Sequence, residues 1–154
     1  ISHKASDESL VKIFSQIPKN LTEKAENLLN FVGLYQKRKL RAGDLSFGQQ
    51  KLLELAMALM NEPEMLLLDE PTAGINPTLI NGIIDRLIKV NQDFGITLFV
   101  IEHNMRVIMQ LAESIFCLAH GKLLANGTPG EIKKDKRVID AYLGAQWCQI
   151  SIQF

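Results

Sequence analysis

The chain has 154 residues, of which 47% are apolar and 22% are charged, and its formal net charge is zero. This length fits one domain of ordinary size with a buried core, so the composition excludes a disordered protein. Because the chain is neutral overall, its net charge gives no reason to expect nucleic acid as a partner. The longest apolar stretch, 96–101, is too short to cross a bilayer.

The first 62 residues have a helical pattern. Apolar residues recur at helical spacing in 7–17, before Pro18, and again in a helix expected from Thr22 to Val32. A third helix is predicted over 50–60, where apolar residues lie on nearly all sides. That distribution is typical of a buried helix.

From Met65 onward, strands and helices alternate. Short apolar runs at 65–68 and 96–101 are typical of parallel strands covered on both faces. The helix between them is expected to begin at Asn76-Pro77 and to end at Gly95. A hairpin is predicted around His120-Gly121. This order indicates an α/β fold with a parallel sheet. The chain therefore divides into a helical part at 1–62, an α/β core at 63–145 and a tail at 146–154 without a clear register.

Polar side chains follow both predicted core strands. Asp69 and Glu70 come directly after the first strand, and His103 follows the second. The carboxyl ends of parallel strands are where α/β proteins place their chemistry. An aspartate there is suited to hold Mg²⁺ beside a nucleotide, a glutamate to polarise an attacking water, and a histidine to contact a phosphate. An ordinary strand end and a structural histidine remain alternatives at this point.

The segment Leu45–Gln50, with the letters LSFGQQ, stands at the start of the third helix. Ser46 and Gly48 would present a hydroxyl and free N–H groups at a positive helix end, which suits an anion. The alternative is that Ser46 is a plain helix cap.

Together these segments resemble the ATP-binding subunits of ABC transporters. LSFGQQ resembles the family's LSGGQ signature, and the letters MLLLDEP at 65–71 resemble Walker B followed by the catalytic glutamate. The letters AGINP at 73–77 resemble the D-loop, and His103 stands where the family has its switch histidine. The resemblance runs from about Leu21 to Gly144. It implies a partial P-loop NTPase-like ABC ATPase core, α/β with parallel strands covered by helices, preceded by a helical signature subdomain.

The resemblance also implies roles and partners. Asp69 would hold Mg²⁺, Glu70 would position the attacking water, and His103 would sense the γ-phosphate. The cofactors are then ATP and Mg²⁺, and the partners are a second ATP-binding subunit in a head-to-tail dimer and transmembrane permease subunits at the cytoplasmic face of the membrane. The signature residues expected at the partner's ATP are Ser46, Phe47, Gly48, Gln49 and Gln50. The D-loop residues expected at the dimer interface are Ala73, Gly74, Ile75 and Asn76.

No Walker A motif, G-x-x-x-x-G-K-[ST], is present. The only Gly-Lys pair, Gly121-Lys122, is followed by Leu123 and has Phe116 five residues before it. The sequence therefore predicts part of a subunit, inactive by itself. Because the resemblance implies a P-loop strand beside 65–68, the strand at 65–68 is expected to have an open apolar edge.

Finer features point to one subfamily. The Asn126-Gly127-Thr128-Pro129 turn, the ending Ala141-Tyr142-Leu143-Gly144 and the aromatic Phe47 in the signature resemble the ATPases of branched-chain amino acid importers. Two alternatives stay open, a truncated remnant that hydrolyses nothing and a non-transport ABC ATPase. The sequence does not name the transported substrate.

Overall fold

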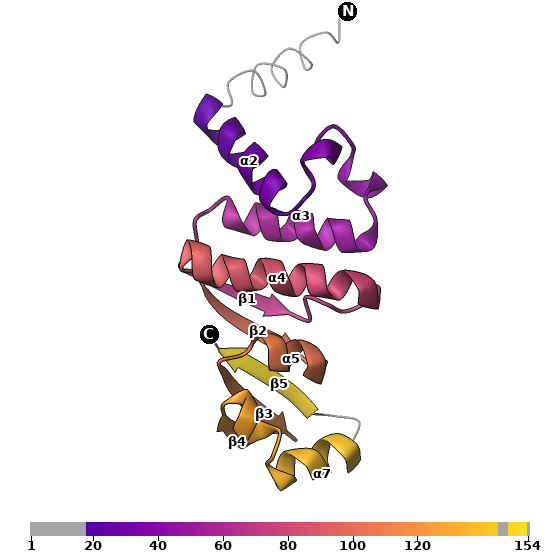
Figure 1. Ribbon diagram of the computed structural model, residues 1–154, viewed down its shortest axis with the longest axis vertical. Helices are drawn as coiled ribbons and strands as arrows, with labels where there is room; N and C mark the ends of the chain where they lie inside the picture. The colour runs from indigo at the N-terminus through magenta and orange to yellow at the C-terminus, as the bar shows by residue number, and fades with distance from the viewer. Residues whose placement is uncertain (1–17, 145–147, 154) are drawn as a thin grey trace, which may run out of the picture.

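The computed structural model describes residues 18–144 and 148–153. In chain order the helices and strands are α2 (Lys19–Phe31), α3 (Phe47–Leu59), β1 (Met65–Asp69), α4 (Pro77–Phe94), β2 (Thr97–Glu102), α5 (Met105–Leu111), β3 (Ser114–Ala119), β4 (Lys122–Gly127), α6 (Pro129–Ile132), α7 (Lys136–Gly144) and β5 (Cys148–Gln153). Two short 3₁₀ turns, Tyr35–Lys37 and Ala42–Asp44, join α2 to α3. Figure 1 shows α2 at one end of the molecule and β4 with α7 at the other. None of the described helices is long and apolar enough to span a bilayer.

The amino-terminal helices follow the predicted pattern with one shift. α2 begins at Lys19 after Pro18 rather than at Thr22, because Leu21 and Thr22 both donate their N–H groups to the carbonyl of Pro18. Gly33 follows the end of this helix at a φ of +76°, as a glycine at a helix end is expected to. The helix predicted over 7–17 lies outside the described residues.

Five strands form one sheet in the order β1-β2-β5-β3-β4. β1 and β2 run parallel, with Asp69 opposite Ile101, and β3 and β4 form the predicted hairpin. His120 and Gly121 both have positive φ angles, 50° and 72°, which is the geometry of a tight hairpin turn. The tail, for which the sequence predicted no register, instead supplies β5, which lies antiparallel between β2 and β3.

Two helices, α4 and α5, pack on one face of β2 (Figure 1). Leu98 and Val100, which alternate along β2, are at most 1% exposed. On the other face of β1, Met65 is 46% and Leu67 is 74% exposed. The prediction that 65–68 is covered on both faces is therefore wrong, because no described helix packs over Leu67. β1 is also the edge strand of the described sheet, as the resemblance implied.

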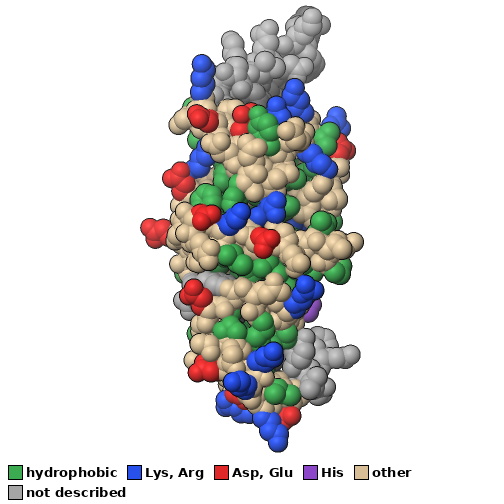
Figure 2. All heavy atoms as spheres, viewed as in Figure 1, with side chains coloured by type: hydrophobic (Ala, Val, Ile, Leu, Met, Phe, Trp, Pro, Cys, Tyr) green, Lys and Arg blue, Asp and Glu red, His purple; other side chains and the backbone are tan. Residues whose placement is uncertain are grey.

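α3 is less buried than its composition predicted. Leu55, Ala56 and Leu59 pack into the core, whereas Met57 is 62% exposed. The remaining apolar side chains of this helix are only partly covered. Figure 2 shows positive and negative side chains interspersed on the face it draws, which fits the neutral charge balance and ordinary solvated surfaces.

Candidate functional site

The end of β1 and the end of β2 bring the two predicted catalytic side chains into contact. His103 Nδ1 lies 3.0 Å from Glu70 Oε1. The parallel register aligns Asp69 with Ile101, so the residues that follow each strand emerge at the same edge of the sheet. The expected convergence of polar groups at the carboxyl ends is thus observed for Glu70 and His103.

Glu70 has an unusual backbone conformation. Its φ is +45°, in the left-handed region that only glycine adopts freely. Such a conformation costs on the order of 1–3 kcal/mol and persists where neighbouring structure imposes it. Here the N–H of Glu70 donates to the carbonyl of Ile101 at 2.8 Å, and its carbonyl accepts from Ala73 at 3.0 Å. The strained turn aims the Glu70 carboxylate across the end of β1 toward His103.

The pair is open to solvent, with the His103 side chain 62% exposed and the Glu70 side chain 45% exposed. The contact engages one carboxylate oxygen, and Oε2 of Glu70 stays available to a water or a ligand. With a proton on Nδ1, the imidazole donates to the carboxylate and fixes its orientation. An oriented carboxylate at an exposed strand end can accept a proton from water.

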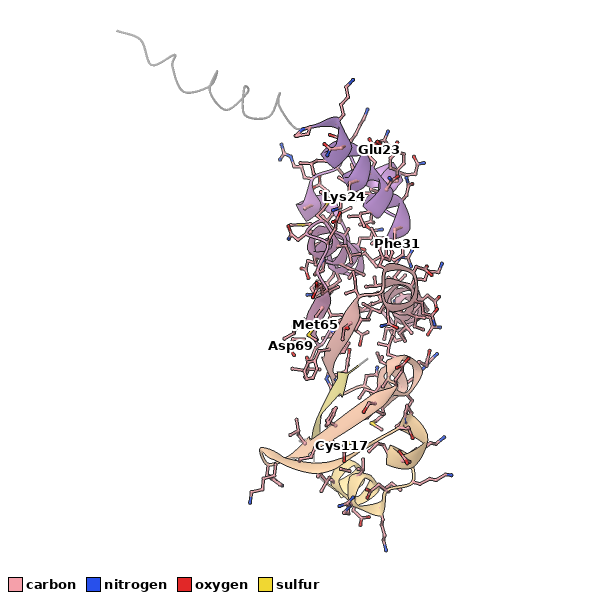
Figure 3. All side chains as sticks on the ribbon, turned by 90° about the vertical axis from the view of Figure 1, so that its left-hand side faces the viewer. Glu23, Lys24, Phe31, Met65, Asp69 and Cys117 are labelled. Atoms are coloured by element: carbon pink, nitrogen blue, oxygen red, sulfur yellow. The ribbon has the colours of Figure 1, made fainter. Side chains whose placement is uncertain are left out.

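Asp69 is the last residue of β1, and its side chain is exposed (Figure 3). Within the described residues, no group of three or more His, Cys, Asp or Glu side chains could hold a metal by itself. Mg²⁺ is normally bound by one or two carboxylates together with substrate phosphates and waters. Asp69 fits the part of a single carboxylate ligand to such an ion.

The signature segment forms the amino end of α3. Ser46 is the N-cap in an extended conformation, and its N–H donates to Gln49 Oε1 at 3.1 Å in a capping-box arrangement. Gln50 Nε2 donates to the carbonyls of Ala42 and Leu45, both at 3.2 Å. Oε1 of Gln49 and Nε2 of Gln50 are therefore occupied within the chain. Ser46 does cap the helix, as the plainer alternative held, while its side chain remains exposed.

The signature packs directly against the D-loop segment. A Cβ added to Gly74, which has a φ of +69°, would lie 3.2 Å from Cε1 of Phe47. Gly48 is buried, and an added Cβ there would lie 3.4 Å from Leu79 and 3.7 Å from Ile75. The contact at Gly74 is tighter than an ordinary one and its φ is left-handed, so a glycine suits this position, whereas the distances at Gly48 are ordinary van der Waals contacts.

Asn76 is committed to the start of α4. Its Oδ1 accepts from the N–H of Thr78 at 3.0 Å and from the Thr78 hydroxyl at 2.9 Å. This is the predicted cap before Pro77. Thr78 therefore occupies the acceptor atom of the Asn76 side chain in this chain.

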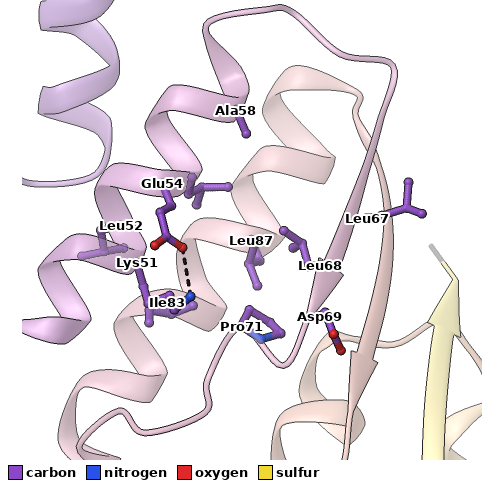
Figure 4. Close-up of a pocket in the computed structure, with 11 residues that line it drawn as sticks. Lys51, Leu52, Glu54, Ala58, Leu67, Leu68, Asp69, Pro71, Ile83 and Leu87 are labelled. Carbon is purple, nitrogen blue, oxygen red and sulfur yellow. Dashed lines mark hydrogen bonds and ion pairs between the residues drawn. The ribbon is translucent and has the colours of Figure 1, made fainter.

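A groove of about 220 Å³ lies between α3 and β1 (Figure 4). Its lining is mostly apolar, with Asp69 at one end and the Lys51–Glu54 ion pair at 2.9 Å at the other. Glu70 and His103 do not line it. The predicted site residues thus form two clusters, Asp69-Glu70 with His103 and the signature with the D-loop.

Two residues beside the first cluster were not predicted to have a role. Thr72 and Glu102 are the two buried polar side chains of the described part of the chain, at 5% and 1% exposure. Thr72 donates to Glu102 Oε1 from both its N–H and its hydroxyl. The strand pattern held the available signal, because the alternation that buries Leu98 and Val100 also turns Glu102, the last residue of β2, toward the buried face.

Comparisons with known proteins decide the family. The ABC transporter profile matches residues 2–73, and a profile described as branched-chain amino acid ATP-binding cassette transporter matches residues 122–147. The chain belongs to the ABC transporter family of ATP-binding proteins. The resemblance stated from the motifs is thereby confirmed.

Relatives with curated descriptions agree. The chain is 34% identical over 130 residues to the probable branched-chain amino acid transport ATP-binding protein LivG of Archaeoglobus fulgidus, covering 84% of the chain and 50% of that protein. It is 36% identical over 131 residues to the high-affinity branched-chain amino acid transport ATP-binding protein BraF of Pseudomonas aeruginosa, covering 85% and 51%. The chain thus spans about half the length of the curated relatives it matches.

Solved structures confirm the α/β ABC ATPase fold. MJ1267, an ATP-binding cassette of an ABC transporter in its ADP conformation, matches with a TM-score of 0.76 and 32% identity, covering 88% of this chain and 56% of MJ1267. CbiO1 from Clostridium perfringens, described as part of the ABC transporter complex cbiONQ, matches with a TM-score of 0.72 and 28% identity, covering 88% and 55%.

Proposed function

We propose that these residues form part of an ATP-hydrolysing subunit that energises an ABC transporter. The observation that carries the proposal is the 3.0 Å contact between Glu70 and His103, at the carboxyl ends of two parallel strands and directly after Asp69. In this proposal Asp69 is a Mg²⁺ ligand, Glu70 positions the water that attacks the γ-phosphate, and His103 orients Glu70 and senses that phosphate. Phosphoryl transfer depends mainly on such positioning and on charge stabilisation.

The second cluster supports a role at a subunit interface. Ser46 is exposed at the positive end of α3, and Phe47 packs on Gly74 of the D-loop segment with 52% of its surface exposed. An exposed serine beside an exposed aromatic residue suits contact with a ligand that another subunit holds. We infer that Ser46, Phe47, Gly48, Gln49 and Gln50 face the ATP of a partner subunit in a head-to-tail dimer, with Ala73–Asn76 beside the interface.

The finer assignment follows the relatives' printed descriptions. LivG and BraF are branched-chain amino acid transport ATP-binding proteins, so amino acid import is the proposed transport process. The permease subunits are the proposed membrane partners, and the proposed location is the cytoplasmic face of the membrane.

A remnant that hydrolyses nothing is the alternative candidate. The two candidates predict different effects of substitutions in a subunit that also contains a P-loop. Under the first, Glu70 and Ser46 act in a full-length subunit. Under the second, substituting them changes nothing except stability.

The experiment is a comparison of Glu70→Gln with Glu64→Gln in a full-length subunit that contains these residues. Glu64 is an exposed glutamate just before β1 and serves as the matched control. We expect Glu70→Gln to lower the ATPase kcat by roughly 10²–10⁴, the usual contribution of a positioned base, with ATP binding nearly unchanged. Turnover near that of the Glu64→Gln variant would remove Glu70 from the proposed role.

A further inference from the structure

A buried carboxylate stands directly before His103 in the chain. Glu102, the last residue of β2, is 1% exposed. Its Oε1 accepts from the N–H of Thr72 at 3.1 Å and from the Thr72 hydroxyl, and its Oε2 accepts from the N–H of Asn104 at 3.2 Å. One carboxylate thus takes three hydrogen bonds from two separate segments.

These two segments are the ones that carry the catalytic candidates. Thr72 stands two residues after Glu70, and Asn104 stands one residue after His103. The Glu102 bridge therefore fixes the turn after β1 relative to the turn after β2. The distance between Glu70 and His103 depends on that relative placement.

An apolar residue would suit this position better if only packing were required. The preceding residues of β2 on the same face, Leu98 and Val100, are apolar and fully buried. Burying a carboxylate is costly unless every hydrogen bond is made, and replacing buried charged groups by apolar ones is often neutral or stabilising. A carboxylate here is thus explained better by what it holds in place than by stability.

We propose that Glu102 is a positioning residue that sets the geometry of the Glu70–His103 pair through Thr72 and Asn104. The geometric part of this proposal rests on the hydrogen bonds of Glu102 with Thr72 and Asn104. Its consequence for catalysis rests on the proposed function of Glu70. Glu102 does not itself touch substrate in this proposal, because it is enclosed on the helix-covered side of β2.

The geometric claim is tested on the chain itself by NMR of its imidazole rings. The chain has three histidines, so the His103 signals are assigned by their loss in His103→Gln. Glu70→Gln should shift the His103 ring nitrogen signals, because the carboxylate contacts Nδ1. We expect this response to fall to half or less in a Glu102→Gln or a Thr72→Val background.

Controls separate positioning from general stability. Glu113→Gln alters an exposed glutamate just before β3 and should leave the full His103 response. Thr72→Ser keeps the hydroxyl and should restore the response that Thr72→Val loses. If Glu102→Gln does not fold, Thr72→Val carries the same comparison. An undiminished His103 response in a folded Glu102→Gln or Thr72→Val variant would overturn the proposal, even if the melting temperature fell.

The catalytic consequence is tested in a full-length subunit. Glu102→Gln should lower kcat roughly 10- to 100-fold with little change in the KM for ATP, since a small misplacement of a catalytic group has effects of this order. Loss of the His103 response together with this loss of kcat supports both proposals. Loss of the His103 response with unchanged kcat supports the bridge and contradicts the proposed function of Glu70.

Discussion

The chain by itself should not bind ATP measurably. Among the described residues, the amino end of α3 can attract a phosphate, but one N–H there, that of Ser46, already donates to Gln49. A helix end typically contributes about 0.3–1 kcal/mol toward an anion. Taken alone, 1 kcal/mol corresponds to a Kd of about 0.2 M. Asp69 and Glu70 add negative charge that repels free phosphates.

That affinity predicts almost no thermal stabilisation. With ligand at about 5 mM, linkage gives roughly 0.02 kcal/mol, and a chain of this size shifts by about 2–4 °C per kcal/mol. The melting temperature should therefore move by less than about 0.1 °C with Mg·ATP. A site with micromolar affinity would give about 5 kcal/mol under the same conditions and a shift of roughly 10–20 °C.

The assay is differential scanning fluorimetry with Mg·ATP on the wild type, Asp69→Asn and Asp140→Asn. Asp140 is an exposed aspartate of α7 and serves as the matched control. We expect no shift for any of the three and no phosphate release. A rise above about 2 °C, corresponding to a Kd of a few millimolar, that vanishes in Asp69→Asn but persists in Asp140→Asn would refute the reasoning.

Two further predictions concern the second cluster. In a full-length Glu70→Gln subunit, Ser46→Arg should prevent ATP-dependent dimerisation in gel filtration, because the larger cation fills the space for the partner's phosphate; an unchanged dimer peak would contradict the role in trans. On the chain itself, Gly74→Ala should lower stability by roughly 1–2 kcal/mol, because the left-handed φ is strained and the new Cβ crowds Phe47. Gly130→Ala, where an added Cβ meets nothing within 4 Å, should have less effect in the same denaturation experiment.

Features decided by local chemistry could be predicted from the sequence. Asn76 caps α4, Gly95 ends it at a φ of +68°, and the turn at His120-Gly121 closes the hairpin. Each depends on a few adjacent residues, so the pattern carries the whole cause. The meeting of Glu70 and His103 was predictable for a similar reason, since parallel strands place their carboxyl ends at one edge.

Burial of β1 and α3 could not be predicted in this way. Leu67 and Met57 are 74% and 62% exposed although their segments are strongly apolar. An apolar run indicates a segment that can be buried. Which element packs over it depends on the tertiary structure. The same limit applies to β5, because its pairing with β2 and β3 joins segments that are distant in the sequence.

Glu102 illustrates a different limit. A glutamate after five apolar or β-favouring residues indicates the end of a strand. The local pattern does not indicate that three hydrogen-bond donors surround its carboxylate. Its role follows from the contacts of Thr72 and Asn104, which lie 30 residues before it and two residues after it. Long-range hydrogen bonds of this kind are visible only once the two segments are placed side by side.

The first cluster, Asp69-Glu70 with His103, lies at the ends of a buried strand, β2, and a partly exposed strand, β1. This position explains how the Glu70–His103 contact can form within this chain. β2 supplies the anchor, because Leu98, Val100 and Glu102 are almost fully buried against α4 and α5. β1 has only β2 as a neighbour among the described strands, and its far face is exposed at Leu67. The turn after β1 is nevertheless tied to β2, by the Glu70 N–H on the Ile101 carbonyl and by Thr72 on Glu102. The geometry of the Glu70–His103 pair therefore depends on the buried strand, and exposure of β1 need not disturb it.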